Sequence, residues 1–312
     1  MLSNFLPPET SVVYRHTVAA QTAAATSTLL FYPFDSVKMR IMSQDGTSLR
    51  AYHQSGHDFR GTFHALVQTQ KIEGFRALYR GASLAVTGAV ISWGIYMFLH
   101  RSMLSFIYDV VHLERWFVTD FGSSLVASAV TACVSNPIWL IKTRMQLTDK
   151  TAGTGDGYCS FRQGFRLILT KEGPRGLFKG LFPQLLLSIP NAAYIPLYDF
   201  LKNSLLFLQG NSTITAPEIV LCTVCSKAAV AVLANPFLVV KAKIQDHRNL
   251  LPGATQPGAI QYSGFMGTVK VTIAREGVVH GLVLRGLMAS LSQTIPRSIF
   301  HILIYEYLLR AL

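Results

Sequence analysis

Four polar side chains recur at every fourth residue near the C-terminal end of the chain: Gln293, Arg297, His301 and Tyr305. On an α-helix this spacing places them on one face, and most residues between them are apolar. A guanidinium can bind a phosphate or a carboxylate through two parallel hydrogen bonds. Lys227 is the second basic residue in a segment otherwise free of charge, and no acidic residue lies at a comparable depth. These residues predict the binding of an anionic solute.

Other reactive side chains do not form sets that could catalyse a reaction or bind a metal. The four cysteines, Cys133, Cys159, Cys222 and Cys225, have no His cluster or second cysteine pair at the spacing of a metal site. No set of Ser, His and Asp residues occurs in a recognisable catalytic motif. The Gly-rich segment 153–157 lacks the Lys of a phosphate-binding loop. We therefore expect a protein that is not an enzyme and that holds no metal or cofactor.

The charged residues leave six long gaps, which set the elements that position the anion site. Asp, Glu, Lys and Arg are absent from 16–34, 81–100, 121–141 and 180–198, while 219–240 contains only Lys227 and 286–305 only Arg297. A helix of about 20 residues crosses the bilayer core. The chain is 14% charged and 50% apolar, against about 25% charged in soluble domains, which excludes a basic nucleic-acid-binding protein. The sequence predicts an all-α membrane protein with six transmembrane helices.

The remaining charged residues are distributed unequally between the two sides of the predicted membrane domain. Connections 35–80, 142–179 and 241–285 hold 21 Lys or Arg and 9 Asp or Glu, whereas the termini and the two short connections hold 5 and 7. By the positive-inside rule the three long connections face the interior of the compartment, and both termini lie on the other side. Residues 1–10 contain no Lys or Arg and no apolar core, so we expect no cleavable signal.

A charged motif occurs three times, about 100 residues apart. Its copies are P-F-D-S-V-K-M-R at 33–40, P-I-W-L-I-K-T-R at 137–144 and P-F-L-V-V-K-A-K at 236–243, and each is followed by Glu-Gly and then by a basic residue and Gly. We divide the chain into repeats 1–112, 113–212 and 213–312. Each repeat has two spans, a proline expected to kink the first, and a short amphipathic helix between them. Three such hairpins close most simply into a ring with pseudo-threefold symmetry.

This thrice-repeated pattern is similar to the signature of the mitochondrial carrier family, and the resemblance covers essentially the whole chain. It implies a six-helix solute exchanger of the inner mitochondrial membrane that needs no ATP or cofactor. Such carriers alternate between states sealed by salt-bridge networks on the matrix and cytosolic sides. The resemblance places both termini on the cytosolic, intermembrane-space side.

The residues that match the family's matrix-side network are called the matrix gate here. They are Asp35, Lys38, Lys142, Lys241, Gln146 and Gln245. Asp35 is the only acid of the three motifs, because Trp139 and Leu238 replace the other two carboxylates, and Met42 stands at the bracing position of the first repeat. One carboxylate can neutralise one ammonium, so we expect a weak gate that favours the matrix-open state, unless the glutamines help to close it.

The cytosolic gate is also incomplete. Its pattern is intact only around Asp199 and Lys202, while the last helix keeps Glu306 but has Leu309 at the basic position. A bridge between Lys202 and Glu306 is the best expected contact. The alternative for all the gate charges is anchoring at lipid headgroups.

The expected substrate contacts are Gly88, Ser92, Trp93, Leu187, Ser188, Asn191, Lys227, Gln293 and Arg297. Six of them follow from aligning the second span of each repeat on the Gly after the basic residue: Gly88, Leu187 and Gln293 lie seven residues on, and Ser92, Asn191 and Arg297 lie eleven residues on. Lys227 is included because it is a charge at membrane depth. Trp93 lies beside Gly88 and Gly94, which leave room for a planar group to stack. The segment 81–96 resembles the flavin adenine dinucleotide (FAD) and folate carriers, whereas Gln293 stands where relatives often have Arg. The alternatives are that Trp93 only packs and that Lys227 binds backbone carbonyls.

The sequence therefore predicts an exchanger of a large anionic cofactor or nucleotide, with FAD or folate ahead of pyrimidine nucleotides and NAD. A second hypothesis is a carrier-fold protein without exchange activity, acting as a scaffold or as a proton or anion leak, and the depleted gates motivate it. We expect a monomer whose other partner is membrane lipid, with cardiolipin as a candidate, and no nucleic acid.

Overall fold

The computed structural model describes residues 8–43, 61–109, 117–148, 158, 160–209, 215–246 and 264–311. These residues are almost entirely helical, and no strand occurs among them. The all-α fold with three repeats, predicted from the charge gaps and the motif spacing, is confirmed.

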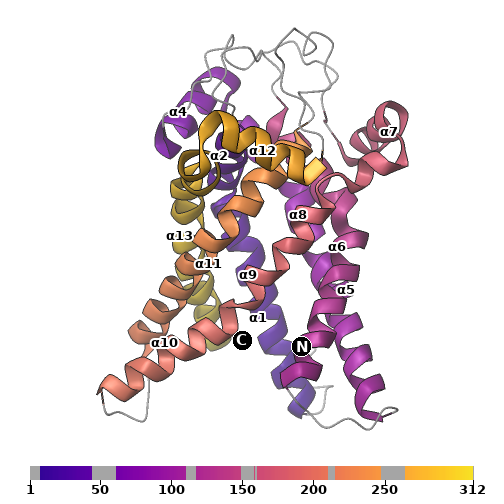
Figure 1. Cartoon of the computed structure of the whole chain (residues 1–312). Coiled ribbons are helices and arrows are strands. Elements are labelled where there is room, and N and C mark those ends of the chain that lie inside the picture. Colours follow the sequence, from indigo (N-terminus) through magenta and orange to yellow (C-terminus); the bar gives the residue numbers. More distant parts are fainter. Residues whose placement is uncertain are drawn as a thin grey trace.

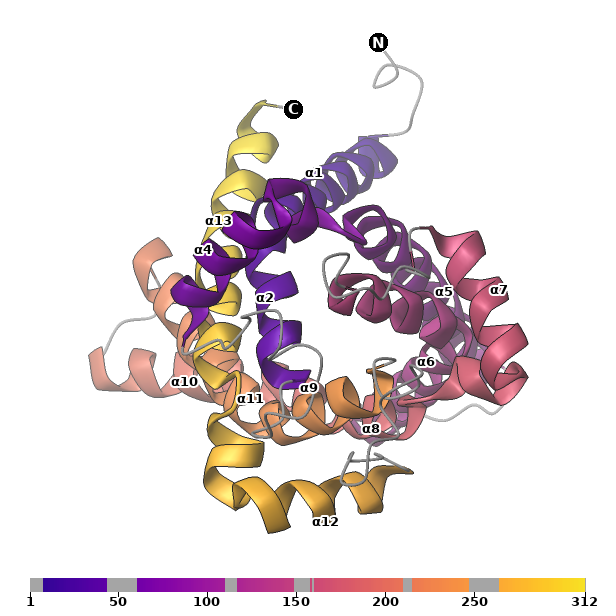
Figure 2. The ribbon, with the colours of Figure 1, turned by 90° about the horizontal axis from the view of Figure 1, so that it is seen from above.

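Six helical units run along the long axis of the molecule. The odd units are α1 (Pro8–Leu30) with α2 (Tyr32–Ser43), α6 (Phe117–Leu147) and α11 (Ala216–Gln245). The even units are α5 (Ala82–Asp109), then α8 (Leu181–Leu186) with α9 (Ser188–Ala192) and α10 (Tyr194–Gln209), and finally α13 (Leu287–Ala311). Seen from above, these units form a ring (Figure 2), in which α13 packs on both α1 and α11.

Proline breaks two of the six units. The first unit is interrupted at Phe31, two residues before Pro33, and the fourth is interrupted at Leu187 and Ala193. Pro190 and Pro196 lie three residues after these two interruptions, where a proline ring clashes with the preceding turn. In contrast, α6 and α11 continue as single helices through their own prolines.

Each repeat carries a short helix followed by a single irregular turn at one end of the ring, a 3₁₀-helix in the first two repeats and a π-helix in the third. They are α4 (Thr62–Glu73) with η2 (Phe75–Tyr79), α7 (Phe161–Glu172) with η3 (Pro174–Phe178), and α12 (Gly264–Glu276) with η5 (Val279–Leu284). Figure 1 shows α4, α7 and α12 at the top, whereas α1 begins and α13 ends at the bottom. The two glycines of each second motif have φ between 69° and 82°, a conformation that other residues rarely adopt, which explains why the motif requires glycine.

Among the described residues, three helical stretches are long and apolar enough to cross a membrane: Phe75–Met103, Gly122–Leu147 and Pro217–Gln245. The pair Gly264–Glu276 and Val279–Tyr305, bent by 112°, adds a fourth when it is counted as one span. The first unit is rich in Ala and Thr and the fourth is divided into three helices, and neither contains such a stretch among the described residues.

Candidate functional site

A cavity of about 540 Å³ lies between the first, fourth, fifth and sixth units. Its polar lining includes Asp35, Lys38, Tyr194, Lys227, Gln293, Arg297 and His301. The structure thus brings together Lys227, Gln293 and Arg297, which the sequence assigned to the substrate site, and it adds Lys38 from the matrix gate. Small residues of α1, α11 and α13, such as Ala24 and Ser290, line the rest and leave the space open.

The cavity carries an excess of positive charge. Within the described part of the chain, no carboxylate lies within ion-pair distance of Lys38, Lys227 or Arg297. Arg297 donates from Nη2 to Oγ1 of Thr28 at 3.0 Å, which fixes its guanidinium against α1. A cation in a low-dielectric site needs a counter-charge, so the arrangement favours an anionic occupant.

An aromatic side chain accompanies these cations. Nζ of Lys227 lies 5.7 Å from the ring centre of Tyr194, close enough for a cation–π contact. Tyr194 begins α10 and lies three residues beyond Asn191, whose side chain lies outside the described part of the structure. The ring therefore offers the cavity a flat apolar surface beside a positive charge.

Asp35 forms the floor of the cavity together with side chains from the other two repeats. Its Oδ2 is ion-paired with Lys142 and accepts a hydrogen bond from Nε2 of Gln146 at 2.9 Å. Its Oδ1 accepts from Nε2 of Gln293 at 2.9 Å. Gln146 also donates to the hydroxyl of Tyr32 at 3.1 Å. A single carboxylate thus connects all three repeats at the matrix gate.

Glutamine side chains provide hydrogen bonds near the positions where Trp139 and Leu238 replace carboxylates. Lys241, for which the sequence left no carboxylate, donates from Nζ to Oε1 of Gln184 at 2.5 Å. Gln146 donates to Asp35, whereas Gln245 donates to the backbone oxygen of Lys179 at 3.3 Å. One ion pair and several amide hydrogen bonds therefore connect the residues that the sequence predicts as the matrix gate.

Trp139, which replaces the second acid, packs between α5 and α6. Its Nε1 donates to Oγ of Ser92 at 3.2 Å, and Nζ of Lys142 lies 6.0 Å from its ring centre. A Cβ atom at Gly88 would lie 2.9 Å from Cγ2 of Ile138, so the glycine allows the two helices to approach closely. Gly88 and Ser92, expected to contact substrate, are therefore engaged with α6 in this conformation.

The other predicted contacts lie away from the cavity lining. The Trp93 side chain is 51% exposed and its ring stacks on Tyr96 at 5.5 Å between centres. Leu187 is buried and Ser188 donates to the backbone oxygen of Leu185 at 2.5 Å. Substrate contact by these residues stays a prediction.

The cytosolic gate falls largely outside the described side chains. This applies to Asp199, Glu306 and Leu309, and Lys202 is half-buried on α10. The expected bridge between Lys202 and Glu306 therefore stays a prediction.

A second polar network, repeated three times, lies between the matrix-gate residues and the end of the ring that carries α4, α7 and α12. The last basic residue of each motif pairs with the glutamate of the following Glu-Gly, and so does the basic residue of the second motif. The three sets are Arg40, Glu73 and Arg80, then Arg144, Glu172 and Lys179, then Lys243, Glu276 and Arg285. Burial raises the pKa of the Glu172 carboxyl, but its bonds to Arg144 and Lys179 outweigh burial and hold the pKa below its usual range.

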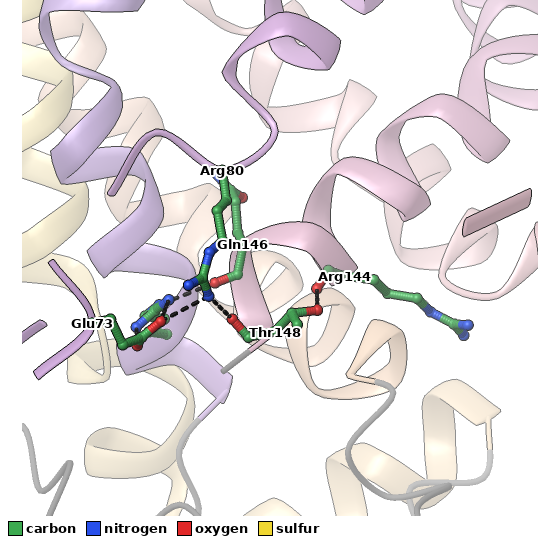
Figure 3. A network of polar contacts seen from close by, with 6 residues as sticks. Glu73, Arg80, Arg144, Gln146 and Thr148 are labelled. Carbon is green, nitrogen blue, oxygen red and sulfur yellow. Dashed lines mark hydrogen bonds and ion pairs between the residues drawn. The ribbon is translucent and has the colours of Figure 1, made fainter. Parts of the chain in front are cut away.

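This network also joins neighbouring repeats. Figure 3 shows Arg80 between Glu73, at 2.8 Å, and the backbone oxygen of Thr148, at 2.5 Å. Arg40 donates from Nε to the backbone oxygen of Gln146 at 3.0 Å. Side chains of the first repeat therefore bind the C-terminal end of α6, which sets the position of the gate residues on that helix.

Sequence reasoning missed Gln184 and Tyr194, and it missed the contact of Gln293 with the gate. An uncharged polar side chain within an apolar helix does not change the distribution of charged residues along the sequence, so that distribution could not reveal these residues. The available signal was position, because Gln184 lies one turn beyond Gly180 and Tyr194 lies almost one turn beyond Asn191.

Comparison with known proteins gives a family for the whole chain. The family model described as "Mitochondrial carrier protein" matches residues 9–110, 114–208 and 212–312. The chain is 28% identical over 310 residues to the chloroplastic folate transporter 1 of Arabidopsis thaliana, covering 96% of each chain. It is 27% identical over 313 residues to the mitochondrial FAD carrier protein FLX1 of Saccharomyces cerevisiae, covering 94% of this chain and 96% of the relative. It is also 26% identical over 301 residues to the mitochondrial nicotinamide adenine dinucleotide transporter 2 of Arabidopsis thaliana, covering 94% and 78%.

Proposed function

The chain belongs to the mitochondrial carrier family, and from that premise we propose that it exchanges an anionic nucleotide or cofactor across an organellar inner membrane. The observation that carries the proposal is the cavity in which Lys38, Lys227 and Arg297 have no carboxylate within ion-pair distance among the described residues. A phosphate or carboxylate group of a substrate supplies the missing negative charge. Members of this family are transporters, so the cavity binds and releases a solute without changing it.

FAD and folate are the first substrate candidates, ahead of pyrimidine nucleotides and NAD. All four classes combine anionic groups with a planar ring, and the cavity combines cations with Tyr194. Relatives whose names specify FAD, folate and NAD match over nearly the full chain, which supports this group of substrates without choosing among them.

A second candidate function is a leak or scaffold without exchange. Its support is the replacement of two gate carboxylates by Trp139 and Leu238. The contacts of Asp35 with Lys142 and Gln146 count against a permanently open pore, because they close the floor of the cavity.

The deciding experiment is uptake into proteoliposomes preloaded with FAD, folate, NAD or a pyrimidine nucleotide. We expect saturable exchange of one of these solutes, at least tenfold reduced in Arg297→Ala and poorly restored in Arg297→Lys, because an ammonium lacks the planar fork. Arg166→Ala, on the exposed face of α7, is the matched control and should exchange normally. Full uptake by Arg297→Ala would refute the assignment, and flux of small ions without exchange would favour the leak.

We further propose that the protein is a monomer in the mitochondrial inner membrane. In the proposed orientation the N-terminal end of α1 and the C-terminal end of α13 lie on the cytosolic side. Cardiolipin is a candidate bound lipid. The charge balance of the long connections supports this orientation. Some relatives are named as chloroplastic, so imaging of the tagged protein tests the compartment. Protease access to a C-terminal tag in intact mitoplasts tests the orientation.

A further inference from the structure

Gln293 is a residue that belongs both to the cavity and to its gate. It lines the cavity, its side chain is buried, and its Nε2 donates to Oδ1 of Asp35 at 2.9 Å. The partner oxygen Oδ2 is already engaged by Lys142 and Gln146. Among the described side chains, Gln293 therefore supplies the only hydrogen bond from the third repeat to this carboxylate.

Arg297 lies one helical turn from Gln293 on the same face of α13. Four residues correspond to a rise of about 6 Å. An anion bound by Arg297, which Thr28 holds in place, therefore lies within reach of the Gln293 amide if its charged group extends along the helix. The Nε2 group of Gln293 has two N–H donors, but turning the amide toward an anion at Arg297 draws it away from Asp35.

We propose that Gln293 couples substrate occupancy to the matrix gate: its amide binds Asp35 when the cavity is empty and moves to the substrate anion when the cavity is filled. This inference rests on the proposed function, because it requires an anionic substrate at Arg297. Filling the cavity removes the bond from the third repeat to Asp35, and the gate is then held only by Lys142 and Gln146. Binding and gate opening are thus linked, since the ligand interacts differently with the open and closed states.

The neutral amide suits this exchange of partners. A hydrogen bond from an amide shifts an equilibrium by roughly two- to tenfold, whereas a buried ion pair is broken at much greater cost. Gln293→Arg should therefore tighten the contact with Asp35, and Gln293→Met, of similar length and without a donor, should abolish it. A purely structural role would make both variants less stable, whereas the coupling role gives them opposite effects on the gate.

The reporter is a cysteine at Ala242, introduced into a chain whose native cysteines are replaced by Ser. Ala242 is fully buried, in a cluster with Met42 and Leu282 at the gate end of α11. A membrane-impermeant thiol reagent applied from that side labels it when the gate opens. Thermal unfolding of each variant shows whether the protein is folded.

Without substrate, we expect labelling to rise two- to tenfold in Gln293→Met and to fall below the unsubstituted protein in Gln293→Arg. Gln293→Asn keeps the amide on a shorter chain and should resemble Gln293→Met. Adding FAD, folate, NAD or a pyrimidine nucleotide should raise labelling in the unsubstituted protein and raise it far less in Gln293→Met. In transport, Gln293→Met should change the maximal exchange rate more than KM, because Arg297 still binds substrate.

Equal empty-state labelling in all variants, or an undiminished substrate response in Gln293→Met, would overturn the coupling. In the background of Asp35→Ala, which removes the acceptor of the Gln293 amide, Gln293→Met should have no further effect, and an equal further increase would also contradict it. If none of the four solutes changes labelling of the unsubstituted protein, the proposed function fails instead. The empty-state comparison then still decides whether Gln293 holds the gate.

Discussion

We predict that closure of the proposed matrix gate depends on Asp35 and that Asp35→Asn opens the gate. The Asp35 and Lys142 side chains are 20% and 10% exposed, so water screens their ion pair only in part. Removing one partner of a buried pair costs about 3–5 kcal/mol, while an exposed pair contributes at most about 1 kcal/mol. The Asp35–Lys142 pair lies between these cases, so we expect Asp35→Asn to destabilise the closed gate by about 2–3 kcal/mol, which is a 30- to 150-fold shift toward the open gate.

The assay is the labelling of Ala242→Cys described above, together with exchange measurements. Asp35→Asn and Lys142→Met should each raise labelling, and the double variant should raise it less than the sum of the two, because each single change leaves the other partner uncompensated. Glu218→Gln, which neutralises an acid at the far end of α11, is the matched control and should label like the unsubstituted protein.

Additive effects in the double variant would refute the reasoning, because they would show that Asp35 and Lys142 do not stabilise each other. Unchanged labelling in Asp35→Asn would show that the contacts seen in the structure do not seal the cavity.

Three further changes test other parts of the structure. Leu238→Asp places an acid in the cavity lining, which also contains Lys38. The new carboxylate should stabilise the closed gate by about 1 kcal/mol and slow exchange. Faster exchange or increased labelling would count against a gate that lacks acidic residues. Tyr194→Ala should raise KM for a planar solute by the equivalent of roughly 1–3 kcal/mol, and it should raise KM for a small anion less. Its effect on the planar solute should also exceed that of Trp93→Ala. A larger effect of Trp93→Ala would assign stacking to Trp93. Glu172→Gln should lower the thermal midpoint at neutral pH. Because the pKa of Glu172 lies below its unfolded value, its contribution is present above the usual range of a glutamate and is lost as pH falls, so the difference should shrink on acidification; a constant difference would exclude this ion-pair network as the cause.

The family and the all-α fold could be predicted from the sequence because both rest on regular spacing. Charge-free gaps of about 20 residues define spans, and a motif that recurs about every 100 residues defines the repeats. The grouping of Lys227, Gln293 and Arg297 followed from similar reasoning, since charged or polar residues within an apolar helix must face a polar space. The structure places all three on one cavity.

The contacts of helix α5 could not be predicted in the same way. Aligning the even spans assumes that the three repeats are equivalent, but Trp139 puts an indole where the first repeat has a carboxylate. The indole reaches Ser92, and Ile138 packs against Gly88, so these two positions contact α6. The cavity lies between the other four units, and Trp93 is absent from its lining.

The weak-gate prediction followed from counting charges, and the structure shows what that count omits. Lys241 binds the amide of Gln184, and Asp35 accepts two amide hydrogen bonds in addition to its ion pair. A neutral hydrogen bond contributes about 0.5–1.5 kcal/mol, which is too small to appear in a charge pattern but is similar to the contribution of a partly exposed ion pair. The predicted bias toward the matrix-open state therefore stays a prediction for the labelling experiment.

A gate of one ion pair and a few amide bonds has consequences for the transport cycle. Changing a two-state equilibrium from 1:99 to 99:1 requires about 5.5 kcal/mol of differential binding. Three salt bridges in a low-dielectric gate would resist such a change, whereas one ion pair and two or three amide bonds, at the magnitudes above, amount to a few kcal/mol. In the proposed exchange cycle, the binding energy of one multivalent anion is then sufficient to shift the gate. This balance favours a substrate-driven exchanger over a leak, because a leak requires the gate to be open without substrate, and the contacts of Asp35 oppose that state.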